Sequence, residues 1–263
     1  MDLHTVTSFR RPAGRDEIRL APGEALLGGG TWLFSEPQPA TTGLVDLTAL
    51  GWPAVELLED GTLRVGATCT VAELVSSPLL GPLAPLVRSA ADAFLMSFKI
   101  QHAATVGGNI ALALPAGAMI SLTAALGGTA LVWTPDGGAR REPVAELVRG
   151  VRATSLAPGE VLRAVDVPLV EREAPTAFRR AALTPHGRSS AVVIGVGDRV
   201  TVTAATTRPV VLAADRIEEG LATVDCWYDD PHGAADWRAD VTAVLARQVA
   251  RELAGEPAGE VHR

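Results

Sequence analysis

The chain is poor in the residues that several functional classes require. Cys69 and Cys226 are its only cysteines among 263 residues, so the chain alone cannot supply the four thiolates of an iron–sulfur cluster. Aromatic residues make up 4% of the sequence, which argues against a base-stacking surface for nucleic acid. The formal net charge of −7 disfavours nucleic acid and anionic membrane surfaces. We therefore predict neither a nucleic-acid partner nor a membrane partner.

Metal-binding and targeting signals are also missing. The five histidines are scattered, and no HxxxH, HExxH or CxxC spacing occurs, so we predict no metal site. No apolar run reaches the roughly 18 residues of a membrane-spanning helix. The opening residues 1–4 lead directly into polar sequence and do not resemble a secretory signal. These features predict a soluble cytoplasmic protein, in which a disulfide is not expected.

Two glycine clusters are the most informative features that the chain does contain. Residues 28–33 read GGGTWL, and residues 105–109 read TVGGN. Glycine has no Cβ, so the backbone can approach a phosphate closely and direct several N–H groups at it. Two such segments can hold a pyrophosphate from two sides. Taken alone, the first cluster is equally compatible with a tight turn, and the second with a bulge between two helices.

Local patterns predict the surrounding elements. Residues 1–50 are predicted to form a small βαβ-like unit with strands at 24–27 and 43–47. Thr70 and Glu73 form a capping-box pattern that opens a helix at 71–76. Further on, four strands of an antiparallel sheet are predicted at 178–183, 191–196, 199–206 and 209–213, followed by an amphipathic helix at 236–253.

Motifs along nearly the whole chain resemble the flavin subunits of the molybdenum hydroxylases, the family of carbon monoxide dehydrogenase and xanthine dehydrogenase. The first glycine cluster resembles the AGGTxL-type loop of that family. The TVGGN block with its flanks, which partly matches QIRNxATxGGNIAxAxPAxD, is the most specific part. Other similar segments are VGATCTVAEL at 65–74, ALGG at 125–128, LAPGEVL at 156–162 and AFRR at 177–180.

The resemblance implies a fold and a domain organisation. The implied fold class is α+β, with an FAD-binding fold of two α/β subdomains, as in the PCMH or vanillyl-alcohol-oxidase type. A C-terminal domain of antiparallel sheet and helices follows, similar to that of the carbon monoxide dehydrogenase flavoprotein. We place FAD-binding subdomain 1 at residues 1–52, subdomain 2 at 53–170 and the C-terminal domain at 171–263. The charged segment 171–173, which is expected to be an exposed linker, marks the last boundary at about 170–175.

The resemblance also implies FAD as the cofactor and a role for individual residues. The main-chain N–H groups of the first cluster are expected to hold the pyrophosphate on one side, and the second cluster on the other. Leu162 is expected to pack on the isoalloxazine ring. Arg180 is expected to replace a lysine at the polar edge of the ring, where a cation favours the anionic reduced flavin. The complete set of expected FAD contacts is Gly28, Gly29, Gly30, Thr31, Trp32, Thr105, Gly107, Gly108, Asn109, Leu162 and Arg180.

The implied function is electron transfer within a larger assembly. We predict an FAD-binding subunit that passes electrons from partner iron–sulfur centres to an acceptor, which the sequence does not identify among NAD, a quinone and oxygen. The implied partners are a large molybdopterin-binding subunit and a small 2Fe–2S subunit. No nucleophile–base set is present, so no catalytic residue is predicted here. Two alternatives stay open: a self-sufficient FAD-dependent oxidoreductase of the same fold, and a scaffold subunit that has lost FAD.

The sequence departs from the family pattern in three ways, of which the changes at 112, 114 and 118 are the only support for the scaffold alternative. Ala118 occupies the position of an aspartate that is expected to hold the adenosine end of FAD, and Leu112 and Leu114 replace polar residues. Residues 100–102 read IQH instead of IRN. The loss of one buried charged hydrogen bond costs roughly 1.5–3 kcal/mol. The two leucines can instead recover apolar contact with an adenine.

Three other polar features have ordinary structural interpretations. His102 is predicted to be a loop residue with an ordinary hydrogen bond rather than a catalytic base. The polar segment 184–190 is predicted to be a surface hairpin, with a place facing the flavin or a partner as the alternative. Asp229 and Asp230 resemble a metal pair, but we predict a solvated turn because Pro231 and Gly233 follow.

Overall fold

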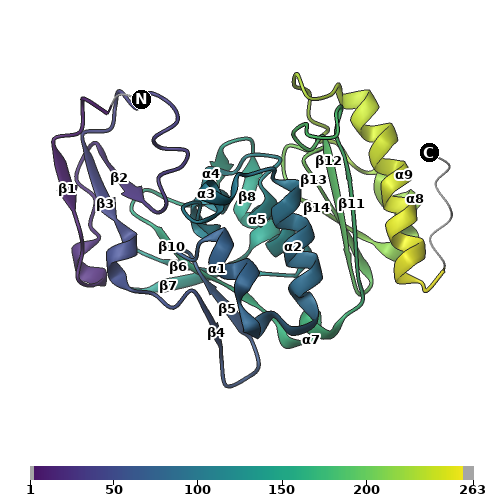
Figure 1. Cartoon of the computed structure of the whole chain (residues 1–263), viewed down its shortest axis with the longest axis horizontal. Helices are drawn as coiled ribbons and strands as arrows, with labels where there is room; N and C mark the ends of the chain where they lie inside the picture. Colours follow the sequence, from purple (N-terminus) through teal and green to yellow (C-terminus); the bar gives the residue numbers. More distant parts are fainter. Residues whose placement is uncertain (1–2, 257–263) are drawn as a thin grey trace.

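The computed structural model describes residues 3–256 and has three main sheets, which follow one another along the molecule (Figure 1). The first sheet is parallel, with the strand order β1-β3-β2, and comprises β1 (Ser8–Arg10), β2 (Glu24–Leu27) and β3 (Gly43–Asp46). The predicted strands are therefore confirmed. The helix of the predicted βαβ-like unit is wrong, because residues 3–50 as described contain only short 3₁₀ helices, Arg15–Glu17 and Leu47–Leu50. The connection from β2 to β3 contains Gly28–Gly30, Pro37 and Pro39, and both residue types disfavour helix.

The central sheet has five strands, and all its pairings are antiparallel. Four helices pack beside it and share the main hydrophobic core with its strands (Figure 1). The strands, in sheet order, are β4 (Val55–Leu57), β5 (Leu63–Gly66), β10 (Val161–Val167), β6 (Thr129–Trp133) and β7 (Ala139–Pro143). The helices are α1 (Val71–Ser76), α2 (Ala84–Ala93), α4 (Val106–Leu112) and α5 (Ala118–Ala125).

The third sheet is antiparallel, as predicted, and a long helix covers it (Figure 1). The second hydrophobic core of the molecule lies between this sheet and that helix. In sheet order the elements are β11 (Thr176–Ala181), β12 (Ala191–Val196), β13 (Arg199–Thr203) and β14 (Val210–Ala213), with α8 (Ile217–Ala222) and α9 (Ala235–Leu253). The predicted C-terminal domain extends to residue 263, and its residues 257–263 lie outside the described part of the chain.

Helix α5 joins the central and the third sheet unit. All eight of its residues are buried, and it packs against α2 as well as β12 and β13. A helix that is apolar on every side must be surrounded by protein. The main core accordingly extends from the central sheet to Val192 and Ile194 of the third sheet.

The capping box predicted from the sequence is present at the start of α1. The Thr70 side chain accepts from the N–H of Glu73 at 3.2 Å, and Glu73 Oε2 accepts from the N–H of Thr70 at 2.8 Å. The predicted capping box and helix bounds are therefore confirmed. The remaining short elements are α3 (Phe98–Gln101), α6 (Val144–Leu147), α7 (Leu169–Glu173), β8 (Val148–Gly150) and β9 (Ala153–Thr154), with 3₁₀ helices at Pro78–Leu83 and Ala214–Arg216.

An aromatic cluster holds the N-terminal unit against the central sheet. The rings of Trp52 and Trp133 meet edge to face, with 5.3 Å between their centroids. The Arg15 guanidinium lies 4.7 Å from the centroid of Trp133, and that of Arg163 lies 4.5 Å from the centroid of Trp52. Such cation–π contacts favour a fixed orientation of the two units.

Candidate functional site

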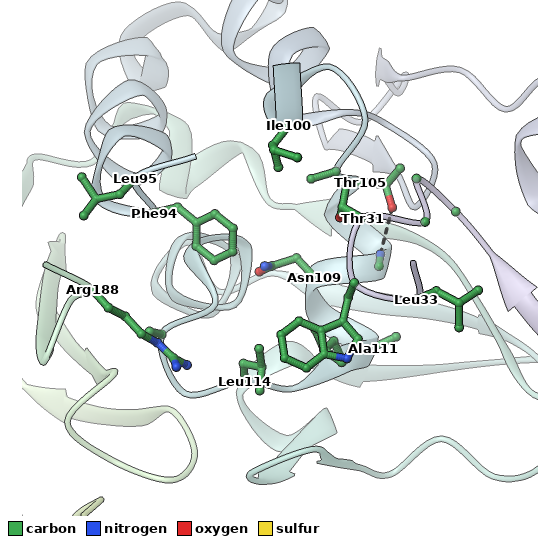
Figure 2. Close-up of a pocket in the computed structure, with 18 of the residues that line it drawn as sticks. Thr31, Leu33, Phe94, Leu95, Ile100, Thr105, Asn109, Ala111, Leu114 and Arg188 are labelled. Carbon is green, nitrogen blue, oxygen red and sulfur yellow. Dashed lines mark hydrogen bonds between the residues drawn. The ribbon is translucent and has the colours of Figure 1, made fainter. Parts of the chain in front are cut away.

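The two glycine clusters and the β11–β12 hairpin line a cavity of about 680 Å³. Its walls come from parts of the segments 26–33, 93–95, 100–116 and 186–189 (Figure 2). Each of the three predicted domains therefore contributes to it. A volume of this size lies in the range of about 300–1,000 Å³ that is typical of small-molecule sites.

The two glycine clusters meet in this cavity. A Cβ on Gly28 would lie 2.8 Å from Thr105 Oγ1, and a Cβ on Gly29 would collide with the carbonyl oxygen of Ala103. Glycine at both positions lets the loop after β2 pack directly on the segment that leads into α4. Eight of the predicted contact residues line the cavity: Gly28, Gly29, Gly30, Thr31, Trp32, Thr105, Gly108 and Asn109.

The loop after β2 presents a row of backbone N–H groups without partners. Within residues 3–256, the N–H groups of Gly29 to Leu33 donate to no acceptor. The carbonyl groups of Gly30 and Trp32 accept from later residues of the loop, each at 2.8 Å. Gly30 has a φ of +70°, a left-handed conformation that glycine adopts without strain. The loop thus brings a run of unpartnered backbone donors to the cavity lining, and such donors suit an anion.

The second cluster is the start of a helix and not a free loop. Thr105 is the N-cap of α4, and its Oγ1 accepts from the N–H of Gly108 at 3.1 Å (Figure 2). The N–H of Gly107 donates to Ala67 O at 2.8 Å, and the N–H of Asn109 donates to Thr105 O at 3.0 Å. The N–H groups of Gly107, Gly108 and Asn109 thus already donate to acceptors within the protein, and the expected contact of these residues with the pyrophosphate remains a prediction.

The chain is similar to known proteins with an FAD-binding domain. Residues 17–170 match the family described as the FAD binding domain in molybdopterin dehydrogenase. The chain belongs to this family. It is 30% identical over 157 residues to the carbon monoxide dehydrogenase medium chain of Afipia carboxidovorans, an alignment that covers 59% of this chain. That alignment spans about half of the relative, 52% of its length.

Solved structures of similar fold cover almost the entire chain. Quinoline 2-oxidoreductase from Pseudomonas putida 86 aligns with a TM-score of 0.80 and 22% identity over 94% of this chain and 96% of the other. Carbon monoxide dehydrogenase from Hydrogenophaga pseudoflava aligns with a TM-score of 0.79 and 20% identity over 95% and 98% of the two chains. The predicted α+β fold, the membership of a flavin-dependent oxidoreductase family and FAD as the cofactor are confirmed.

The cavity of this FAD-binding chain fits a dinucleotide in three ways. The unpartnered N–H groups suit a diphosphate, and none of the described residues that line the cavity is Asp or Glu. Most of the remaining lining is apolar, as the faces of flavin and adenine rings require. The buried Nε1 of Trp32 has no hydrogen-bond partner within the described chain. Since buried donors are normally paired, an acceptor atom of a ligand in the cavity would satisfy it.

Asn109 has two tasks in the structure. Its Oδ1 accepts from the N–H of Met119 at 3.0 Å and so caps the first turn of α5, whose own N-cap residue makes no side-chain cap. Its amide group points toward Phe94 in the cavity (Figure 2). The residue therefore fixes the floor of the site and leaves the amide N–H₂ available to a ligand.

Three expected contact residues lie outside the cavity lining and remain predictions. Gly107 of α4 packs closely on Ala67, because a Cβ on Gly107 would lie 2.5 Å from the Cβ of Ala67. Leu162 lies in β10 opposite Val132 and is buried in the main core. Arg180 lies in β11 and donates to the carbonyl oxygen of Gly187 at 2.8 Å.

The family departures are distributed unevenly around the site. Leu112 and Leu114 line the cavity, whereas Ala118 is buried at the start of α5 and does not. His102 is the exposed C-cap residue of α3 and lies outside the lining. The leucines therefore make this part of the wall more apolar, which favours ring contact over hydrogen bonding.

Several lining residues were not assigned to the site from the sequence. Phe94 and Leu95 follow the end of α2, and His186 and Arg188 belong to the hairpin between β11 and β12. The hairpin itself is confirmed by the pairing of its strands, but it faces the cavity rather than only solvent. Leu95 has a φ of +54°, an unusual backbone conformation in a non-glycine residue that sequence patterns do not reveal.

Two polar side chains outside the cavity have structural roles. Asp230 forms a tight turn with Gly233, as predicted, but its carboxylate pairs with the buried Arg238 and is not simply solvated. Burial raises the pKa of the Cys69 thiol to about 12, so it is an inert core residue beneath α4.

Among residues 3–256 no group of three His, Cys, Asp or Glu side chains is arranged to hold a metal. The helices of this part of the chain are too short or too polar to span a bilayer.

Proposed function

We propose that this chain is the electron-transferring FAD subunit of a molybdenum hydroxylase-type oxidoreductase. The observation that carries the proposal is the row of unpartnered N–H groups from Gly29 to Leu33, which lines the same cavity as Thr105. These N–H groups would hold the diphosphate of FAD. The hydroxyl groups of Thr31 and Thr105 and the amide of Asn109 would add donors to the same region.

The division of labour within the site follows from the side chains that are present. Bound FAD supplies two-electron and one-electron redox chemistry. The chain binds and orients it, and the apolar residues Phe94, Ile100 and Leu114 exclude water from its rings. No substrate-activating nucleophile or base is proposed here, so substrate oxidation would take place on a partner.

Partner docking is supported by apolar side chains at the edge of the cavity. Phe98 is 70% exposed, and Leu95 and Ile100, which line the cavity, are 40% and 41% exposed. Exposed apolar clusters of this kind are typical of protein contacts. We propose that a small 2Fe–2S subunit and a large molybdopterin-binding subunit assemble with this chain and that the contact beside the cavity receives the electrons.

The first test is the visible spectrum of the purified chain before and after incubation with FAD. We expect flavin bands that are released as FAD on denaturation, and a rise in melting temperature with added FAD. A colourless protein that FAD does not stabilise would support the scaffold alternative. Oxidation of a small organic substrate by the isolated chain would support the self-sufficient enzyme.

The assembly is tested separately by purification from the native source. We expect two further subunits, one with molybdopterin and one with iron–sulfur centres, to co-purify with this chain. A Phe98→Glu variant would weaken the association if the exposed cluster is the contact, while FAD binding stays unchanged because Phe98 is not part of the lining. Purification of the native chain without any partner would count against the proposed role.

A further inference from the structure

The hairpin between β11 and β12 delivers a cationic side chain to the cavity. His186, Arg188 and Ser189 of this hairpin line it. They are the only lining residues from the third sheet unit in the described chain, and His186 and Arg188 are the only titratable groups in that lining. The hairpin is therefore the source of positive charge in an otherwise uncharged site.

The backbone on both sides of Arg188 is anchored. The Arg180 guanidinium donates to the carbonyl oxygen of Gly187 at 2.8 Å, and the N–H of Gly187 donates to Thr184 O at 2.9 Å. On the other side, the buried Ser189 hydroxyl donates to the carbonyl oxygen of Ala93 at 3.0 Å. The residue between these two anchors has little freedom to shift.

A second layer of contacts holds the end of the hairpin. The N–H of Ser190 donates to Ala181 O at 2.8 Å, and its hydroxyl donates to His232 O at 2.6 Å. Arg238 of α9, which is 1% exposed, donates to the carbonyl oxygen of Ser190 at 2.8 Å. The hairpin is thus supported by the core of the third unit.

The Arg188 side chain itself is unpaired. Among residues 3–256 it has no hydrogen-bond or ion-pair partner, whereas Arg179, Arg199 and Arg238 of the same unit each pair with a carboxylate. Figure 2 shows it extending toward Leu114, on the opposite side of the cavity from Thr31 and Thr105. The hairpin backbone holds this exposed side chain at the cavity wall, where its unpaired guanidinium is available to an anionic group of a ligand.

We propose that Arg188 contacts the isoalloxazine ring of bound FAD and stabilises its reduced, negatively charged form, with Arg180 and Ser189 as positioning residues. This inference rests on the proposed function. The diphosphate donors lie on the far side of the cavity, so Arg188 meets one of the two arms of the dinucleotide. Adenine carries no negative charge near neutral pH, whereas the flavin ring gains one on reduction. The cation therefore matches the flavin arm.

The proposal refines the expectation for Arg180. That residue supports the loop from outside the cavity, and the cation at the ring would come from Arg188, eight residues later. Its effect is differential, because a cation stabilises the reduced ring more than the uncharged oxidised ring. Loss of the guanidinium should therefore change the affinity for one redox state and not the other.

The test is a measurement of FAD affinity and two-electron potential for the full-length chain and three variants. For Arg188→Gln we expect the Kd for oxidised FAD to stay within about threefold, and reduced FAD to bind about tenfold more weakly, which is a potential about 30 mV lower. Arg188→Lys keeps the charge and should keep the potential close to that of the unchanged chain. Arg179→Gln is the matched control, because Arg179 precedes Arg180 in β11 but pairs with Glu252 of α9 at 2.6 Å.

Each other result would overturn the proposal. Equal loss of affinity for oxidised and reduced FAD, accompanied by loss of ADP binding, would place Arg188 at the adenosine arm or the diphosphate. An unchanged potential in Arg188→Gln would show that the guanidinium does not act on the ring. Failure of the unchanged chain to bind FAD is a different result, since it would overturn the proposed function itself.

Discussion

At the residue scale, glycine performs two different tasks in the two clusters. Gly28 and Gly29 allow the loop after β2 to lie on residues 103–105, and Gly30 adopts a left-handed conformation in that loop. Gly107 instead permits close packing of α4 on Ala67. The same residue type therefore indicates a ligand loop in one place and helix packing in the other.

Substitution of Gly29 by alanine should abolish the FAD site. The added Cβ would collide with the carbonyl oxygen of Ala103, which forces the loop away from the second segment. We expect at least about a tenfold loss of FAD affinity, the equivalent of about 1.4 kcal/mol, in a fluorescence titration. Gly14→Ala is the control, because a Cβ there meets nothing within 4 Å. Unchanged affinity in Gly29→Ala would contradict the proposed role of the loop.

At the element scale, single ionic contacts hold neighbouring segments in place. Arg238 ties α9 to the hairpin and to the turn at Asp230, while Arg10 of β1 reaches across β3 to Glu24 of β2. Both contacts lie beside elements that shape the cavity. β2 leads directly into the glycine loop, and the hairpin carries Arg188.

Removal of the buried guanidinium of Arg238 should destabilise the third unit. Arg238→Met leaves the Asp230 carboxylate and several carbonyl oxygens without their donor, and breaking a buried pair in this way costs about 3–5 kcal/mol. Denaturant unfolding measures the loss. The exposed Arg251 of the same helix is the control, and Arg251→Met should change stability by no more than about 0.5 kcal/mol. Similar effects of both substitutions would refute the proposed anchoring.

The Arg10–Glu24 pair should make the N-terminal sheet sensitive to acid. The hydrogen bond from Arg10 lowers the pKa of Glu24 to about 2. A depressed carboxyl pKa contributes stability that is complete above the unfolded value of about 4.3 and is lost as the pH falls toward the folded value. We expect the free energy of unfolding of the unchanged chain to fall more steeply than that of Glu24→Gln between about pH 5 and pH 2. Glu59→Gln, at an exposed position, is the control, and parallel curves for Glu24→Gln and the unchanged chain would contradict the prediction.

At the scale of the whole molecule, the cavity belongs to no single unit. Its lining combines the loop after β2, the ends of α2 and α4, and the β11–β12 hairpin. The aromatic cluster around Trp52 and Trp133 joins the first unit to the second, and the buried α5 joins the second to the third. A ligand in the cavity therefore contacts all three units at once.

Binding of FAD should protect distant segments together. With FAD at 100 times its Kd, the expected stabilisation is about 2.7 kcal/mol. In hydrogen exchange we expect slower exchange at 28–33, at 94–101 and at 184–190 in the same experiment. The outer strand β14 is the internal control, because no residue of it lines the cavity. Protection confined to 28–33 would show that the hairpin does not take part in binding.

Much of the fold was predictable because its signals are local. The capping box at Thr70, the strands of the third sheet and the amphipathic α9 depend on neighbours in the chain, and all are confirmed. The helical state of residues 106–112 was missed, although Thr105 is a typical N-cap residue, because two adjacent glycines weaken the helix signal. The domain boundaries at 52 and 170 remain predictions, with each main sheet lying within one predicted range.

The sequence by itself determined the family, the cofactor and the loop that would hold a diphosphate, since these follow from short contiguous motifs. Only the tertiary structure decided which donors are free. It engages the N–H groups of Gly107 to Asn109 within the protein, leaves those of Gly29 to Leu33 open, and brings Arg188 rather than Arg180 into the cavity. Hydrogen-bond partners and cavity walls come from residues far apart in the chain, and no local pattern specifies them.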